Sequence, residues 1–207
     1  MTQRATSHLD AIVLAAGRGV RFGGSKLTAS LDGAPLLAGA LLTAFLSPAR
    51  RVIVAIGPEL AVQKAVEATV ARLAATDRLD FAPIDDPSAG MGASLAASAL
   101  RVPDDTAGVF VFLGDMPRID PSTPRLLAGV LGDPRGIVAP SYLGRRGHPV
   151  LFGADWLPAL RELSGDEGAR AVIDRAGERL VRVPVDDPGV HLDVDRPGDL
   201  DRLRTDR

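Results

Sequence analysis

A glycine-rich stretch directly after an apolar run carries the residues best suited to chemistry. It covers residues 14–26, LAAGRGVRFGGSK, and follows the mostly apolar residues 9–13. Glycines let a backbone turn close against a ligand, and Arg21 and Lys26 place positive charge where phosphate groups would lie. The stretch therefore predicts a phosphate-binding loop.

Two common phosphate-binding loops do not fit this spacing. A Walker-type loop needs Gly-Lys followed by Ser or Thr, whereas here Gly24 is followed first by Ser25 and then by Lys26. A dinucleotide-binding loop needs Gly or Ala three residues after Gly19, where Phe22 stands. The next apolar run, residues 52–56, also ends without a ribose-binding carboxylate. Both loop classes are excluded.

Short β-rich runs alternate with helical patterns along the chain. This alternation predicts a single-domain, Rossmann-like α/β fold with a mostly parallel sheet and helices on both faces. We assign residues 1–8 to a flexible tail and residues 9–207 to the domain. The predicted strands cover residues 11–14, 51–56, 79–82, 109–113, 137–139, 150–152 and 180–183. The predicted helices cover residues 35–46, 62–73, 91–100, 121–131, 155–163, 168–176 and 197–203.

The composition limits the partners. The 207 residues carry a formal net charge of -2, so a nucleic-acid partner is not expected and any phosphate site must be local. The chain has no cysteine, which excludes disulfides, thiolate metal sites and thiol nucleophiles. No apolar run approaches the roughly 18 residues of a membrane helix, and the polar first residues lack a signal-peptide core. We therefore expect a cytoplasmic protein with no membrane partner.

An acidic residue follows the predicted strand 109–113, in the sequence Gly114-Asp115-Met116-Pro117. Ligands of parallel sheets bind beyond the carboxyl ends of the strands, so Asp115, the glycine-rich loop and the turn-rich residues 82–92 should meet in one crevice. A carboxylate there suits Mg²⁺, which prefers oxygen ligands and shares them with substrate phosphates. Alternatively, Asp115 caps the next helix or an Asx turn.

A second acidic cluster, DVDRPGDL, covers residues 193–200. Alternation places Asp193 and Asp195 on one face of an extended segment, so one of them can complete a metal site with Asp115. We choose Asp193, although the sequence does not decide between the two. Asp199, in the first turn of the last helix, serves the helix dipole. Taken alone, the cluster is also typical of a helix N-terminus.

The loop and the two acidic elements together resemble the molybdenum cofactor cytidylyltransferase family, which comprises MobA- and MocA-like nucleotidyltransferases. The signature of this superfamily reads Leu-Ala-Ala/Gly-Gly-x-Gly-x-Arg-x-Gly-x-x-Lys. Its fixed positions are occupied here by Leu14, Ala15, Ala16, Gly17, Gly19, Arg21, Gly23 and Lys26. Residues 31–37 and 90–95 also resemble family elements, and the likeness runs from about residue 12 to residue 203.

The resemblance implies transfer of a nucleotidyl group to the phosphate of the molybdopterin cofactor, with Mg²⁺ and release of pyrophosphate. It implies catalytic roles for Arg21, Lys26 and Asp115, and Mg²⁺ binding by Asp115 and Asp193. CTP is favoured over GTP because Ala16 matches the Ala-Ala-Gly form of the cytidylyl branch. The residues implied to contact the nucleotide are Leu14, Ala15, Ala16, Gly17, Gly19, Arg21, Lys26, Ser94 and Asp115.

Two later elements, at residues 146–152 and 165–170, resemble family elements that face the acceptor. They imply acceptor contacts by His148, Asp166 and Arg170, and a client molybdoenzyme is a further implied partner. Simpler explanations exist, since His148 can be a surface turn residue, Ser94 a small helix residue and Arg170 a solvated helix charge.

Two other functions remain open. One is a related nucleotidyltransferase that uses GTP or acts on a sugar phosphate or another small phosphate acceptor. The other is a non-catalytic chaperone that binds the molybdenum cofactor. An oxidoreductase is hard to support because the dinucleotide fingerprint is missing.

Overall fold

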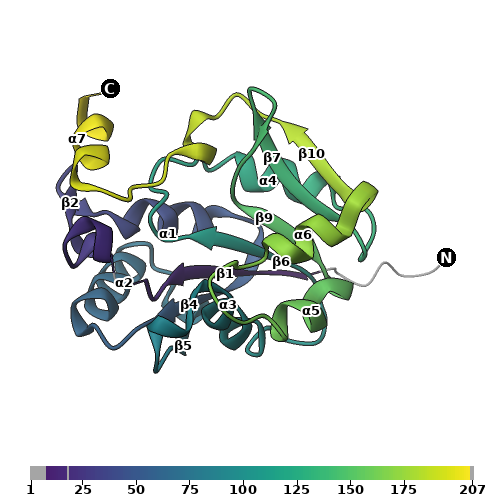
Figure 1. Ribbon diagram of the computed structural model, residues 1–207, viewed down its shortest axis with the longest axis horizontal. Helices are drawn as coiled ribbons and strands as arrows, with labels where there is room; N and C mark the ends of the chain where they lie inside the picture. Colours follow the sequence, from purple (N-terminus) through teal and green to yellow (C-terminus); the bar gives the residue numbers. More distant parts are fainter. Residues whose placement is uncertain (1–7, 18, 206–207) are drawn as a thin grey trace.

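The computed structural model describes residues 8–17 and 19–205 (Figure 1). The main strands are β1 (His8–Ala15), β4 (Ala49–Ile56), β5 (Leu79–Pro83), β6 (Thr106–Leu113), β7 (Ile137–Tyr142), β8 (Arg145–Arg146), β9 (Val150–Gly153) and β10 (Leu180–Pro184). Within the described residues they form an eight-stranded sheet in the order β10-β7-β9-β6-β1-β4-β5, with β8 paired to β7. Apart from His8, which begins β1, the predicted tail lies outside the described residues.

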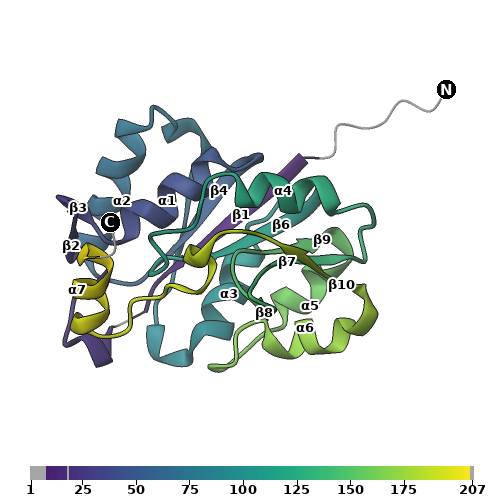
Figure 2. The same ribbon diagram turned by 90° about the horizontal axis from the view of Figure 1, so that it is seen from above.

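Helices cover both faces of this sheet. They are α1 (Leu37–Leu46), α2 (Leu60–Arg72), α3 (Met91–Ala99), α4 (Thr123–Val130), α5 (Leu157–Arg161), α6 (Arg170–Ala176) and α7 (Pro197–Thr205). Figure 2 shows α1, α2 and α4 on one face and α3, α5 and α6 on the other. The predicted α/β fold is confirmed, and each predicted strand and helix overlaps an observed one. No helix in the described part of the chain is long and apolar enough to cross a membrane.

The central strand β1 is buried on both faces because its side chains alternate between two cores. Ala11 and Val13 belong to the apolar cluster that includes residues of α1 and α2. Ile12 belongs to the opposite cluster, with Leu95 of α3. Ala11, Ile12 and Val13 are all fully buried. A near-continuous apolar run is what a parallel strand covered on both sides requires.

The sheet is mixed rather than wholly parallel. β9 pairs antiparallel with both β6 and β7, and β8 pairs antiparallel with β7. The neighbours β5, β4, β1 and β6 pair in parallel, as β7 and β10 do. The carboxyl ends of β5, β4, β1 and β6 therefore lie at one edge, where parallel sheets bind their ligands.

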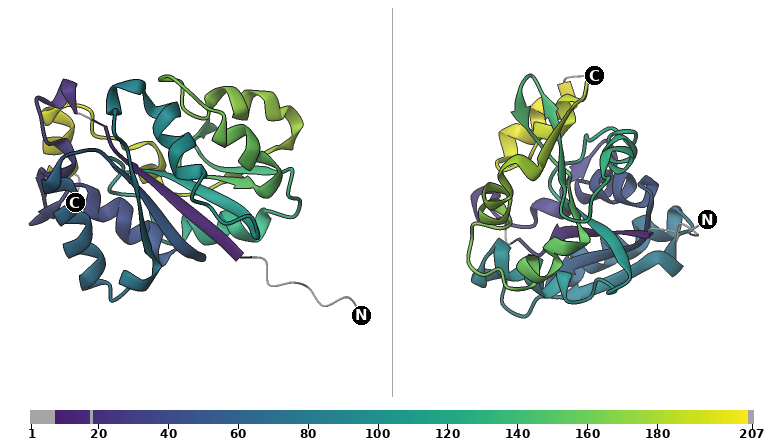
Figure 3. Two further views of the ribbon diagram at one scale, coloured as in Figure 1. Left: turned by 90° about the horizontal axis from the view of Figure 1, so that it is seen from below. Right: turned by 90° about the vertical axis from the view of Figure 1, so that its right-hand side faces the viewer.

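A small hairpin and the last helix pack together beside that edge. The hairpin consists of β2 (Ser30–Leu31) and β3 (Ala34–Pro35), and Figure 3 shows the yellow α7 beside it. Leu31 clusters with Leu200 and Leu203 of α7. Arg204 donates a hydrogen bond to the Ser30 carbonyl over 2.7 Å. This packing holds the end of the chain next to the segment that follows the glycine-rich loop.

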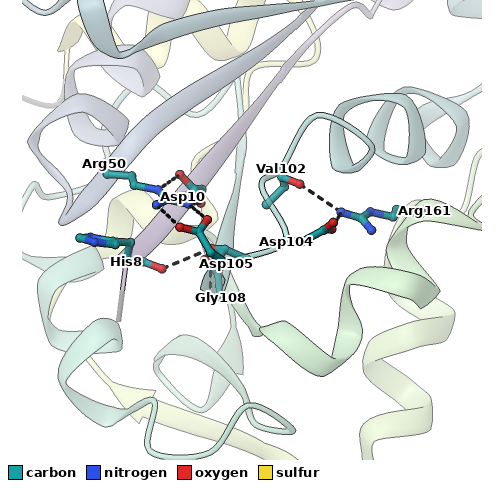
Figure 4. Close-up of polar contacts among 9 residues, drawn as sticks. His8, Asp10, Arg50, Val102, Asp104, Asp105, Gly108 and Arg161 are labelled. Atoms are coloured by element: carbon teal, nitrogen blue, oxygen red, sulfur yellow. Dashed lines mark hydrogen bonds and ion pairs between the residues drawn. The ribbon is translucent and has the colours of Figure 1, made fainter. Parts of the chain in front are cut away.

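A buried ion pair holds the opposite, amino-terminal end of β1 (Figure 4). Asp10 is fully buried and accepts hydrogen bonds from Arg50 Nε over 3.2 Å and from Nη2 over 3.3 Å. Arg50 also contacts Asp105, whose side chain is 66% exposed. Hydrogen bonds to Asp105, and then to Asp10, raise the pKa of the Arg50 guanidinium. Arg50 therefore stays charged and neutralises the buried carboxylate.

We predict that Asp10→Ala lowers the free energy of unfolding by about 3 kcal/mol, because it leaves Arg50 without its buried partner. Asp105→Ala should cost much less, since that carboxylate lies in solvent. Urea unfolding of both variants measures the difference. Equal decreases in the free energy of unfolding would show that the buried Asp10 contributes no more to stability than the exposed Asp105.

Candidate active site

Residues that follow three parallel strands line one cavity of about 240 Å³, which we name the central cavity. Ala16 and Gly17 follow β1, Pro87 and Gly90 follow β5, and Asp115 follows β6. The remaining lining residues are Leu14, Met91, Ser94, Leu113 and Asp166. The predicted crevice therefore exists at the edge where the strand ends meet.

The glycine-rich loop turns back on itself after Gly19. The N–H groups of Phe22 and Gly23 donate to the Gly19 carbonyl over 2.9 Å and 3.2 Å. Gly19 has a φ of 58°, and a Cβ there would lie 2.7 Å from the Gly24 carbonyl oxygen. The Gly24 N–H also donates to the Gly19 carbonyl, over 3.4 Å. Because three loop N–H groups are used in this turn, positive side chains carry much of the loop's attraction for phosphate. Arg18 lies outside the described residues.

Lys26 joins the loop to both acidic elements. Its Nζ lies 2.7 Å from Asp115 Oδ2 and 3.4 Å from Asp195 Oδ1, and its side chain is only 11% exposed. Arg21 Nη1 lies 3.4 Å from Asp195 Oδ2, but the Arg21 side chain is 76% exposed. A shallow depression beside them is lined by Gly19, Arg21, Lys26 and Asp195. Arg21 is thus free to turn toward a phosphate, whereas Lys26 is held in place.

The second acidic cluster lies against Asp115. The Val194 N–H donates to the Asp115 carbonyl over 3.1 Å, which places residues 193–195 beside that strand end. Burial raises the pKa of the Asp193 carboxyl, and the charges of Asp115 and Asp195 raise it further against the opposing charge of Lys26. Asp115 and Asp195 therefore lie close enough to Asp193 for their charges to act on it, with the Lys26 ammonium beside them.

These carboxylates fit a hard cation that binds only in part to protein. Among residues 8–17 and 19–205, no group of three His, Cys, Asp or Glu side chains forms a ready metal site. Asp115 and Asp193 supply oxygen atoms only. Mg²⁺ is commonly held by one or two carboxylates, with phosphate oxygens and water completing its shell. The donor set is suited to such an ion once a nucleotide brings its phosphates.

A second cavity adjoins the central one and shares Leu14, Met91 and Leu113 with it. His148 and Arg170 line this second cavity, which we name the acceptor cavity because the sequence predicts acceptor contacts for these two residues. Burial lowers the pKa of His148 to about 4, and the charges of Arg146 and His191 add to the effect. His148 is therefore neutral at pH 7. Arg170 is 78% exposed and lies 4.0 Å from Asp174, so it stands at the rim as a solvated charge.

Asp166 lies in the central cavity with Asp115, whereas His148 and Arg170 line the acceptor cavity. Asp166 reaches the central cavity because the loop that carries it packs on the start of α3, where the Gly92 N–H donates to the Gly165 carbonyl over 2.7 Å. Gly90, with a φ of 98°, leaves no room for a Cβ, which would lie 2.4 Å from that carbonyl. Two family-like elements far apart in sequence thus form one wall.

Ser94 is buried, and its hydroxyl donates to the Gly90 carbonyl over 3.2 Å, one turn earlier in the chain. This bond stabilises the turn that leads into α3. Ser94 also lines the central cavity, so its oxygen stands next to the space that a nucleotide would fill. Both explanations of this residue, the packing one and the binding one, agree with its position.

A third cavity shares Ala16, Gly17 and Pro87 with the central cavity and extends to the residues that follow β4. The sequence motifs did not reveal several of its residues. It is lined by Ala15, Ala16, Gly17, Gly57, Pro58, Glu59, Val62, Asp86, Pro87 and Ser88. Glu59 stands three residues after the end of β4. The signal that could have found it is the turn Gly57-Pro58, which follows a parallel strand just as the other site elements do.

A sheet of this topology, with a glycine-rich loop, paired cations and carboxylates at its carboxyl edge, defines a nucleotide-binding α/β enzyme. Residues 11–182 match the model of the MobA-like NTP transferase domain family, and the chain belongs to this family. The chain is therefore a nucleotidyltransferase, and the resemblance expected from the sequence is confirmed.

Relatives align along nearly the whole chain. The purine catabolism protein PucB of Bacillus subtilis is 28% identical over 200 residues, which cover 95% of this chain and 96% of PucB. The crystal structure of an Rv0371c homolog from Mycobacterium sp. strain JC1 is 30% identical, covers 95% of this chain and 94% of its own, and has a TM-score of 0.77. Rv0371C of Mycobacterium tuberculosis, crystallised in complex with manganese, is 27% identical with a TM-score of 0.75, covering 97% and 100% of the two chains.

Proposed function

We propose that this protein transfers CMP from CTP to the phosphate of the molybdopterin cofactor and releases pyrophosphate. The observation that carries the proposal is the adjoining pair of cavities at the carboxyl edge of the sheet. One holds Asp115 close to Lys26 and the glycine-rich loop, and the other holds His148. Two substrates can therefore lie side by side, with their reacting groups where the cavities meet.

The reaction forms a bond between an acceptor phosphate oxygen and the α-phosphorus of the nucleotide, while the bond from the α-phosphorus to the bridging oxygen of pyrophosphate breaks. Pyrophosphate leaves with the electron pair of that bond. The attacking phosphate is already ionised, so no protein nucleophile is needed. Arg21 and Lys26 neutralise the phosphates and hold them in line.

Asp115 and Asp193 are the residues we assign to Mg²⁺. Mg²⁺ held by these two carboxylates would supply charge neutralisation to the substrate phosphates. The protein's own contribution is the position of the two carboxylates, which the bond from the Val194 N–H to the Asp115 carbonyl maintains. Manganese in the crystal of the relative Rv0371C supports a divalent cation in this family.

Ala16 supports CTP as the donor. Its side chain is buried against Ala55 and Ile84, and it lines both the central and the third cavity. Ala16 therefore lies where the base and ribose would meet the main chain of the loop. The relative PucB is named as a purine catabolism protein, and we propose that the client molybdoenzyme acts in the same area of metabolism.

The assay for this function combines the purified protein with molybdopterin cofactor, Mg²⁺ and either CTP or GTP, and measures pyrophosphate. We expect turnover with CTP, at least about tenfold above that with GTP, and none when the cofactor is omitted. If turnover occurred only with a sugar phosphate, the acceptor would be a sugar phosphate and not the molybdopterin cofactor. Binding of the cofactor without pyrophosphate release from either nucleotide would indicate a chaperone instead.

A further inference from the structure

The acceptor cavity contains a cation with one nitrogen that makes no hydrogen bond. Arg146 lines this cavity, and its Nη1 atom is buried with no hydrogen-bonding partner in the described part of the chain. A buried guanidinium N–H that makes no bond loses its hydration without compensation. Natural structures tolerate such a group mainly where a ligand, an ion or a water completes it. Arg146 therefore calls for an explanation in terms of binding.

The charges around Arg146 do not neutralise it. Burial is the main cause that lowers the pKa of its guanidinium; among the nearby charges Asp174 opposes this shift most, while Arg182 and Arg170 add to it. Asp174 is itself 4.0 Å from Arg170. Among the residues that line this cavity, Arg146 and Arg170 are cationic and Glu167 is anionic, so the lining carries a small net positive charge. An anionic or carbonyl oxygen placed at Arg146 Nη1 would be stabilised there.

The backbone holds Arg146 firmly. It is the last residue of β8 and pairs with Ser141 of β7. The N–H groups of the next two residues donate to the carbonyls of Pro140 and Val190, over 2.8 Å and 3.1 Å. A fixed backbone on both sides reduces the ordering that a ligand must impose on this residue when it arrives, which favours affinity.

The position of Arg146 separates it from the chemistry at phosphorus. It lines the acceptor cavity but not the central cavity that holds Asp115. Much of the lining of the acceptor cavity is apolar and includes Leu95, Val150, Phe152 and Ile173. A molecule filling this cavity would place an apolar or planar body on these side chains and a polar group at Arg146.

We infer that Arg146 determines acceptor specificity by binding a second oxygen-bearing group of the acceptor, one that is distinct from the phosphate that attacks the nucleotide. This inference rests on the proposed function. It defines the acceptor class as a molecule with a reacting phosphate at one end, an apolar or planar body, and a carbonyl or anionic oxygen at the other end.

The test uses Arg146→Met, which keeps the long apolar stem and removes the charge. Arg145→Met is the matched control because Arg145 precedes it in the same strand, is exposed, and points to the opposite side by alternation. With CTP, Mg²⁺ and molybdopterin cofactor, Arg146→Met should raise KM for the cofactor at least about tenfold and leave KM for CTP unchanged. Arg145→Met should change neither.

A second measurement separates binding from structural support. Without ligands, Arg146→Met should melt about 2–4 °C above the parent protein, because it removes an unpaired buried donor. Molybdopterin cofactor should raise the melting temperature of the parent and of Arg145→Met. The rise should be much smaller for Arg146→Met. An unchanged KM for the cofactor, or a lower melting temperature with KM values for both substrates raised, would overturn the inference.

Failure of the proposed function and failure of the role of Arg146 give different results. If the parent protein releases no pyrophosphate but its melting temperature rises with the cofactor in an Arg146-dependent way, the transfer reaction is wrong and the role of Arg146 stands. If the cofactor neither reacts nor raises the melting temperature, the role of Arg146 toward this acceptor falls as well.

Discussion

Asp115→Asn is expected to lower the rate of nucleotidyl transfer by at least about a thousandfold while leaving the melting temperature nearly unchanged. Asparagine has the same shape, and its amide oxygen can still accept the hydrogen bond from Lys26 Nζ, which is 2.7 Å away in the parent. What the variant lacks is the negative charge that a divalent cation needs. The measurement is kcat at saturating CTP, cofactor and Mg²⁺, with thermal melting in parallel.

Two neighbouring variants serve as controls and decide which carboxylate is the second metal ligand. Asp195 contacts both Lys26 and Arg21. Asp195→Asn should therefore weaken the ion pairs that position these two side chains and lower kcat by about tenfold. Asp193→Asn should approach the loss of Asp115→Asn and raise the Mg²⁺ concentration needed for half-maximal rate. If Asp195→Asn lost more activity than Asp193→Asn, Asp195 would be the second metal ligand. Near-normal activity of Asp115→Asn would remove the metal role from this residue.

Local patterns in the sequence were sufficient to predict the longer strands and the helices, but not the two-residue strands β2, β3 and β8. A run such as residues 109–113 is buried on both faces in β6, so its apolar character directly reports a central parallel strand. The helix predicted over residues 62–73 rests on Val62, Val66 and Val70, which are the buried residues of α2. Both patterns depend on neighbours within one turn or one pleat, which the sequence displays.

Long-range arrangement was not predictable in the same way. The antiparallel place of β9 between β6 and β7 depends on how connections cross the sheet, and the apolar run 150–152 reads the same in either direction. The contact between Arg21 and Asp195 joins residues 174 positions apart. Asp115 could be placed near the loop because the strand ends of one sheet converge, whereas residues 193–200 follow no strand end and were joined to the site by the family pattern.

The sequence does not display which cavity each side chain of the candidate site lines. Asp166 lies in the central cavity because Gly92 bonds to Gly165, a contact that no periodicity reveals. Arg146 stands in a motif that pointed to the acceptor, yet no local pattern reveals that its Nη1 is buried without a hydrogen-bonding partner in the described part of the chain. Residue types indicated the class of chemistry, whereas the packing of loops decided which atoms face which cavity.

A substitution behind the site should impair catalysis without touching any substrate. Gly39, in the first turn of α1, packs against the backbone of Pro117, two residues beyond Asp115. A Cβ at position 39 would lie 2.2 Å from the Pro117 carbonyl oxygen and 2.8 Å from its Cα. Because these are backbone atoms, no side-chain rotation relieves the clash, and the strand end that carries Asp115 must move.

We expect Gly39→Ala to lower kcat by about a hundredfold, since misplacement of a catalytic group by about 1 Å costs that much. It should also lower the free energy of unfolding by about 1–3 kcal/mol through overpacking. Kinetics under saturating substrates and urea unfolding measure the two effects.

Gly129→Ala is the matched control, because this glycine also lies in a helix, α4, but is exposed, and a Cβ at this position would have no atom within 4 Å. Alanine favours helix over glycine at both positions, so intrinsic propensity alone would stabilise both variants by about 0.5–1 kcal/mol. Only Gly129→Ala should realise that gain, with normal kcat. If Gly39→Ala also gained stability and kept its kcat, the contact with Pro117 would not be what positions Asp115, and the hydrogen bond from the Val194 N–H to the Asp115 carbonyl would have to carry that role.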